Sequence, residues 1–237
     1  MRSIIIAAVV TVALAGCATS GTSTEPNEPT EAPAQTMAAE VPADPQEALV
    51  VAIQAGDATA LQAALDAGAD PNADIGPRTS ALQAAVRHNS VDLVTALLDA
   101  GADPASADSS GYTPLHRAAE LASGHVVAAL LEAGAPTDVY TTDRYGLGVL
   151  HAAAYHNNVE AIEVLLAAGV PINDQGGNFQ ATPLHWAAFY NSVDAIQVLV
   201  MYGADVTLLN EGGETPLDAA ILAGNAEAQA ALEALAR

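Results

Sequence analysis

A four-residue phrase recurs along most of this chain at almost constant spacing. Each version precedes small residues and then a leucine- or valine-rich segment. The glycines that close these segments lie 33, 33, 35 and 34 residues apart. A period of this length predicts a solenoid, in which each unit packs only against its neighbours. The phrases are Ser80–Gln83, Thr113–His116, Gly148–His151, Thr182–His185 and Thr215–Asp218, and the glycines are Gly68, Gly101, Gly134, Gly169 and Gly203.

The residue types of the phrase suit the start of a helix. A threonine hydroxyl, as at Thr113 and Thr182, can accept a hydrogen bond from a first-turn N–H that has no partner within the helix. Proline can follow at the first helical position, because its missing N–H would have no partner there. Each full unit is therefore predicted to hold an inner helix, an outer helix, and a glycine that ends the outer helix in the left-handed conformation.

From about residue 46 to its end, the chain resembles the ankyrin-repeat family in its Thr-Pro-Leu-His phrases, the alanine pairs after them and the closing glycines. The resemblance implies an all-α solenoid of helix-turn-helix repeats with β-hairpin-like finger loops. We expect a repeat domain over 46–237 with two outer units that act as caps. Its units are about 46–73, 74–106, 107–139, 140–173, 174–207 and 208–237.

The chain departs from the family pattern in the phrase and in the fingers. Gln83 and Asp218 stand at the position of the motif histidine. Gly148-Val149 replaces Thr-Pro, which predicts a weaker helix start in the fourth unit. Two extra residues fall within 136–143 and one more precedes Thr182, so we expect these two fingers to project or flex differently from family fingers.

The first residues read as an export signal. A basic start is followed by an apolar run over 4–15, too short to span a bilayer comfortably. The run ends in Leu-Ala-Gly-Cys at 14–17, which resembles a bacterial lipobox. That resemblance implies a lipoprotein signal peptide over 1–16, cleaved before Cys17, with lipidation of this single cysteine. An ordinary signal peptide with an incidental cysteine is the alternative.

Residues 17–45 are predicted to form a disordered tether, because the segment is rich in Pro, Thr, Glu and Ala and has few residues able to build a core. The mature chain would have no disulfide, because its one cysteine carries the lipid. Residue 18 is alanine, not the aspartate that retains many lipoproteins in the inner membrane. By family analogy, the expected location is the periplasmic face of the outer membrane of a Gram-negative host.

Charge narrows the classes of partner. The formal net charge is −22, and all six basic residues are arginine. Nucleic acid is excluded as a partner class, because phosphate binding needs clustered basic residues. Contact with an anionic lipid surface is disfavoured for the same reason, so the membrane is expected to be reached only through the lipid on Cys17. A basic protein partner would be attracted; plain solubility is the alternative explanation of the charge.

Aromatic residues are concentrated in the middle of the repeats. All nine lie between residues 112 and 202. The family register places some on finger tips and others just after the alanine pairs, where ankyrins line a concave groove, and aromatic residues and arginine dominate binding hot spots. We predict a partner-binding groove formed by Tyr112, Tyr145, Tyr155, His156, Phe179, Phe189 and Tyr190, with Arg87 and His88 at equivalent variable positions.

Two aromatic residues are interpreted differently. Trp186 is expected to be partly core and Tyr202 to pack on the surface of an outer helix. The competing interpretation of the whole set is that the rings merely pack against one another and against the loops.

Catalysis is not indicated by any motif. The chain lacks nucleophile-elbow, metalloprotease and phosphate-loop patterns. His116, His151 and His185 recur at one motif position and are predicted to brace the neighbouring backbone. We therefore expect no catalytic residue, no metal site and no cofactor.

A protein-binding module is the function expected from these features. Within that class, an immunity-type inhibitor of a periplasmic toxin or effector is one alternative. An accessory subunit of an envelope enzyme is another.

Overall fold

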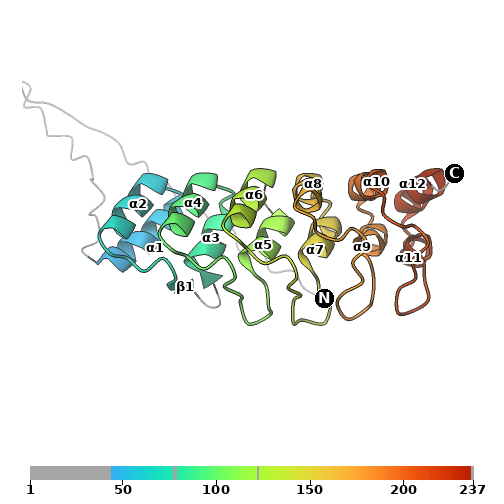
Figure 1. The fold of residues 1–237 in the computed structure, drawn as a ribbon, viewed down its shortest axis with the longest axis horizontal. Helices are drawn as coiled ribbons and strands as arrows, with labels where there is room; N and C mark the ends of the chain where they lie inside the picture. Colours follow the sequence, from blue (N-terminus) through green and yellow to red (C-terminus); the bar gives the residue numbers. More distant parts are fainter. Residues whose placement is uncertain (1–43, 77–78, 122, 236–237) are drawn as a thin grey trace, which may run out of the picture. The chain divides into compact units, whose positions relative to one another are not determined.

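Twelve short helices in six successive pairs make up most of the residues described by the computed structural model, which are 44–76, 79–121 and 123–235. The helices of each pair lie one above the other, and successive pairs form a row (Figure 1). This arrangement confirms the predicted all-α solenoid. The helices are α1 (Pro45–Ala55), α2 (Ala58–Asp66), α3 (Ala81–Arg87), α4 (Val91–Asp99), α5 (Pro114–Leu121), α6 (Gly124–Glu132), α7 (Val149–Tyr155), α8 (Val159–Ala167), α9 (Pro183–Phe189), α10 (Val193–Met201), α11 (Pro216–Ala223) and α12 (Ala226–Leu235).

The starts of the inner helices follow the predicted capping chemistry. Thr182 caps α9 by accepting from the His185 backbone N–H, and Thr215 caps α11 in the same way. The Thr113 hydroxyl accepts from the His116 N–H at 3.3 Å. Gly148 precedes α7 and has no side chain to offer, so the weaker start predicted for the fourth unit is confirmed.

The closing glycines end the outer helices as predicted. The φ values of Gly68, Gly101, Gly134, Gly169 and Gly203 lie between 83° and 97°. This left-handed backbone strains any residue with a Cβ atom, which explains why glycine is the second residue after each of the outer helices α2, α4, α6, α8 and α10.

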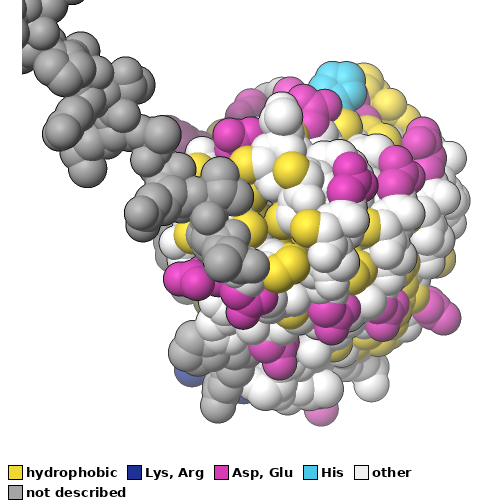
Figure 2. Space-filling view, turned by 90° about the vertical axis from the view of Figure 1, so that its left-hand side faces the viewer, with side chains coloured by type: hydrophobic (Ala, Val, Ile, Leu, Met, Phe, Trp, Pro, Cys, Tyr) yellow, Lys and Arg dark blue, Asp and Glu magenta, His cyan; other side chains and the backbone are white. Residues whose placement is uncertain are grey.

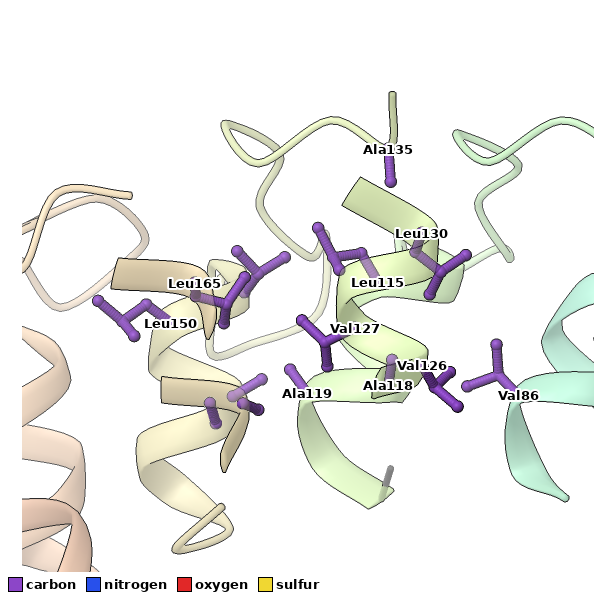
Figure 3. Packing of buried hydrophobic residues seen from close by; sticks show 14 of the residues in the cluster. Val86, Leu115, Ala118, Ala119, Val126, Val127, Leu130, Ala135, Leu150 and Leu165 are labelled. Atoms are coloured by element: carbon purple, nitrogen blue, oxygen red, sulfur yellow. The ribbon is translucent and has the colours of Figure 1, made fainter. Parts of the chain in front are cut away.

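A continuous aliphatic core runs through the stack, between inner and outer helices and between neighbouring pairs. Figure 3 shows the side chains of α5 and α6, such as Leu115 and Val127, between Val86 of α3 and Leu150 of α7. Each fully buried leucine stabilises the fold by about 1.5–3 kcal/mol relative to an exposed one. Alanine pairs such as Ala118-Ala119 are also fully buried, which lets neighbouring inner helices approach closely.

The fingers between pairs contain little sheet. One antiparallel ladder joins β1 (Asp74–Gly76) to β2 (Thr79–Ser80), and a single bridge pairs Tyr140 with Gly148. The fingers with extra residues are bonded to the fingers beside them. The Thr142 N–H donates to the Ser110 carbonyl at 2.7 Å, and the Asn178 amide donates to the Asp143 carbonyl at 3.1 Å.

Within 44–235, apart from the gaps noted above, no helix has both the length and the apolar character needed to cross a bilayer. The predicted signal peptide and Cys17, and all but the end of the predicted tether, lie outside the described residues.

Candidate protein-binding groove

One row of variable positions follows the inner helices along the stack. The inner helices pack against one another in chain order, so the residues seven and eight positions after the first residue of each phrase recur from unit to unit along one face. The row begins with polar residues and ends with apolar ones. From α3 to α11 its members are Arg87 and His88, Glu120 and Leu121, Tyr155 and His156, Phe189 and Tyr190, and Leu222 and Ala223.

Trp186 lies at the centre of an aromatic cluster on this face. Its ring is stacked with Tyr190 at a centroid distance of 5.9 Å and an interplanar angle of 8°. It meets Tyr145 and Phe179 edge-on at 5.6 and 6.1 Å. Tyr155 completes the cluster, 4.1 Å from the Tyr190 ring. Such pairs contribute about 0.5–1.5 kcal/mol each beyond their area burial, so the cluster is a fixed surface.

A cavity of about 460 Å³ opens beside this cluster. Its volume falls within the range of roughly 300–1,000 Å³ that is typical of ligand pockets, and most of its lining is apolar. Aromatic rings from the fingers that precede α7 and α9, and from α9 itself, form its walls. The lining residues are Arg144, Tyr145, Phe179, Ala181, His185, Trp186, Phe189, Tyr190, Asn210, Glu214 and Ala219.

The middle of the row is polar and centred on Glu120. Its carboxylate lies 2.6 Å from the Arg117 guanidinium and 3.6 Å from His156 Nε2, and its side chain is only 9% exposed. Burial alone would raise the pKa of Glu120, but the hydrogen bond to His156 and the charge of Arg117 hold it below its ordinary value. Burial, and then the Glu120 charge, raises the pKa of Tyr112. This network is therefore anionic at its centre and fully partnered.

The structure brings together some of the predicted groove residues. Tyr145, Phe179, Phe189 and Tyr190 line the cavity, and Tyr155 joins them through Tyr190. Burial and the neighbouring tyrosines raise the pKa of Tyr190 to about 12, so its hydroxyl is neutral.

The other predicted residues lie apart from the cavity. His156 contacts the Tyr155 ring and Glu120. Tyr112 packs against His116 and under Arg117. Arg87 and His88 are exposed at the end of α3.

The competing interpretation, that the rings only pack together, describes part of the cluster. The rings do contact one another, yet Phe179 and Phe189 remain 44% and 47% exposed. Both rings lie in the lining of one cavity, and contiguous exposed apolar surface of this kind is typical of interaction sites.

Sequence reasoning missed two residues of this face. Trp186 is 8% exposed, as expected for a partly core residue, but it also lines the cavity. Leu222 is 66% exposed and extends the row onto α11. The sequence signal was present, because Leu222 stands seven residues after Thr215, as Phe189 does after Thr182.

The repeated histidines bond the finger of the next unit. His116 Nε2 lies 3.0 Å from the Leu147 carbonyl, and His185 Nε2 lies 2.9 Å from that of Glu214. Gln83 makes the equivalent bond to the Tyr112 carbonyl at 2.8 Å. Burial lowers the pKa of His116 and His185. Across the described ranges, His, Cys, Asp and Glu side chains form no group of three or more that could hold a metal ion.

Comparison with known proteins identifies the class. The family model for ankyrin repeats matches residues 49–143, 126–210 and 150–234, so the chain belongs to the ankyrin-repeat family. The human ASB11 ankyrin repeat domain is similar at a TM-score of 0.69 and 30% identity, over 80% of this chain and 83% of that chain. None of the curated proteins matches the chain.

A second solved structure is bacterial. It is a chain of the complex between the predatory endopeptidase Bd0816 of Bdellovibrio bacteriovorus and the immunity protein Bd3460. The TM-score is 0.67 and the identity 27%, over 79% of this chain and 97% of that chain. Ankyrin repeats form protein–protein interaction modules, typically as binding scaffolds and not as enzymes, and this chain is such a module.

Proposed function

We propose that the chain captures a protein partner on the row of inner-helix positions, with the aromatic cluster as its main contact, and catalyses no reaction. The observation that carries the proposal is the exposure of Phe179 and Phe189 beside a cavity whose walls are already fixed by ring packing. A surface ordered before binding loses little conformational entropy when the partner arrives.

We further propose that this module is held at the periplasmic face of the outer membrane through lipid on Cys17. The support is the sequence of residues 1–18, with its basic start, short apolar run, lipobox-like end and alanine at 18. Cys17→Ala should abolish the incorporation of labelled palmitate into the protein. A variant that still incorporates the label would contradict lipid anchoring through Cys17.

The binding proposal is tested by partner capture in the native envelope. Affinity-tagged full-length chain would be cross-linked in cells and recovered, and bound proteins identified by mass spectrometry. Phe179→Ala with Phe189→Ala should reduce capture by tenfold or more, on the order of a hot-spot loss. Both rings are half exposed, so helical content and thermal unfolding should stay close to wild type.

A matched control removes exposed apolar surface elsewhere. Met201 and Tyr202 at the end of α10 are 71% and 50% exposed, and Met201→Ala with Tyr202→Ala should leave capture unchanged. If the cavity variant captures as well as wild type, or if both variants lose capture equally, the proposed groove is wrong.

An immunity-type role is the second candidate. It is favoured by the similarity to a chain from an endopeptidase–immunity protein complex, which extends over 97% of that chain. Under this proposal, the partner is a toxic protein that the bound groove inhibits. Expressing the captured partner in the periplasm should impair growth, and co-expression of this chain should restore it. Unrelieved toxicity, or a harmless partner, would contradict inhibition and favour an adaptor.

A further inference from the structure

The cavity beside the aromatic cluster carries a carboxylate in its wall. Glu214 lines it together with Asn210, whose amide donates to the Glu214 carboxylate at 3.0 Å. Phe179, Phe189 and Trp186 supply ring surface around the same space. Ring faces and a carboxylate both attract a cation, and a planar cation can stack on rings while it hydrogen-bonds to an acid.

Guanidinium groups already lie over the tyrosines of this side of the molecule. The Arg144 guanidinium lies 4.5 Å from the centre of the Tyr145 ring at the cavity rim. The Arg117 guanidinium lies 5.1 Å from the centre of the Tyr112 ring. Two of the three arginines in the described part of the chain therefore lie over a tyrosine, and the Arg144–Tyr145 pair does so in the cavity lining itself.

The charge of the whole molecule favours the same ligand. The chain carries a formal charge of −22, and Figure 2 shows acidic side chains at several places on the end of the stack formed by α1 and α2. A negative field of this size raises the association rate of basic proteins and disfavours acidic ones.

We propose that the cavity binds an arginine side chain of the partner protein, stacked on the rings and paired with Glu214. This inference rests on the proposed function and specifies the chemistry of the partner. An arginine presented on a basic surface satisfies both the local lining and the overall charge. An aliphatic or neutral side chain could pack against the rings but would gain nothing from the negative charge of the Glu214 carboxylate.

Trp186 provides a direct readout, because it is the only tryptophan in the chain and lies in the cavity wall. The mature chain with Cys17→Ser would be titrated with the peptide acetyl-Gly-Arg-Gly-amide up to about 10 mM, beyond the millimolar affinity expected of weak ligands. The same peptide with citrulline in place of arginine keeps the shape and removes the charge. We expect a saturable change in tryptophan emission with arginine and about tenfold weaker binding of citrulline.

Two isosteric variants test the carboxylate. Glu214→Gln keeps the size of the side chain and the hydrogen bond from Asn210. It should weaken binding of the arginine peptide by about tenfold, while binding of the citrulline peptide should change little. Glu163→Gln on the outer helix α8 makes the same change in net charge away from the cavity and should have no effect. Equal binding of the two peptides, no saturable response, or equal effects of the two variants would overturn the inference.

Failure here is distinguishable from failure of the proposed function. If partner capture depends on Phe179 and Phe189 but the arginine peptide does not bind, the groove remains and the guanidinium site is wrong. If the arginine peptide binds as described but the Phe179→Ala, Phe189→Ala variant captures the partner as well as wild type, the guanidinium site stands and the proposed capture surface is wrong.

Discussion

The same motif histidine is held in two different ways in the fourth and fifth units. In the fifth unit, His185 Nδ1 accepts from the Thr182 backbone N–H at 3.1 Å and lies 2.8 Å from its hydroxyl. In the fourth unit Gly148 replaces the threonine, and His151 Nδ1 is buried without a hydrogen-bond partner among the described residues. The nearest acid is Asp174, whose carboxylate lies 3.8 Å away.

The fourth unit compensates for the lost threonine with its own side chains. Tyr140 bridges to Gly148, and its hydroxyl donates to the Asp174 carboxylate at 2.7 Å. A Cβ atom on Gly148 would lie 3.1 Å from the Tyr140 ring, and one on Gly176 would lie 2.1 Å from it. The ring thus occupies the space beside the histidine, and His151 Nε2 still bonds two finger carbonyls, those of Asp174 and Ala181. At the fourth unit, where glycine replaces the consensus threonine, the histidine site is therefore completed by the Tyr140 ring and its bond to Asp174.

The largest effect should come from removing a motif histidine. His185→Ala and His151→Ala should each lower the free energy of unfolding by about 3 kcal/mol, because each leaves a cavity and unpaired buried carbonyls. His185→Gln should cost much less, since Gln83 makes the equivalent bond within this chain. Urea unfolding of the three variants would check this. A glutamine variant as unstable as the alanine variant would show that the side-chain bond to the next finger is not what matters.

The regular parts of this fold could be predicted from sequence, because their causes are local. Thr182 followed by Pro183, and glycine at a fixed spacing, specify where helices start and end wherever they occur. The alanine pairs then place the variable positions in one row. The same register would have predicted Leu222, which stands seven residues after Thr215 as Phe189 stands seven residues after Thr182.

The histidine site of the fourth unit and the cavity could not be predicted in the same way. Gly148 signalled a lost cap, but the role of Tyr140 depends on a three-dimensional approach to Gly176, which lies in the next finger. The cavity likewise depends on how Phe179 of one finger meets Trp186 of the following helix. Contacts of this kind arise from packing between units, and no repeat position specifies them.

A smaller effect is expected from restoring the consensus. Gly148→Thr should destabilise the protein by about 2 kcal/mol and not stabilise it, because its Cβ would lie 3.0 Å from His151 Nδ1 and 3.1 Å from the Tyr140 ring, which is held against Gly176 and cannot easily move away. Thr182→Gly, the reverse exchange, should cost about 1 kcal/mol, because it removes both the capping hydroxyl and the hydroxyl contact of the buried His185 Nδ1. Combining Gly148→Thr with Tyr140→Ala in a double-mutant cycle should give a favourable coupling. Additive costs, or a stabilising Gly148→Thr, would refute the compensation by Tyr140.

The smallest effect concerns pH and the carboxylate that distinguishes the two sites. Burial lowers the pKa of His151 below its ordinary value of 6.5, and the Asp174 carboxylate opposes this. The unfolded chain therefore takes up the proton first, so stability is fully present above about pH 6.5 and declines as the pH falls toward the folded pKa. Asp174→Asn removes the opposing charge, which should lower the His151 pKa and deepen the acid loss by about 1 kcal/mol or less. Histidine NMR titrations should show a lower pKa for His151 and an unchanged one for His185; an unchanged His151 would mean that the carboxylate does not act on it.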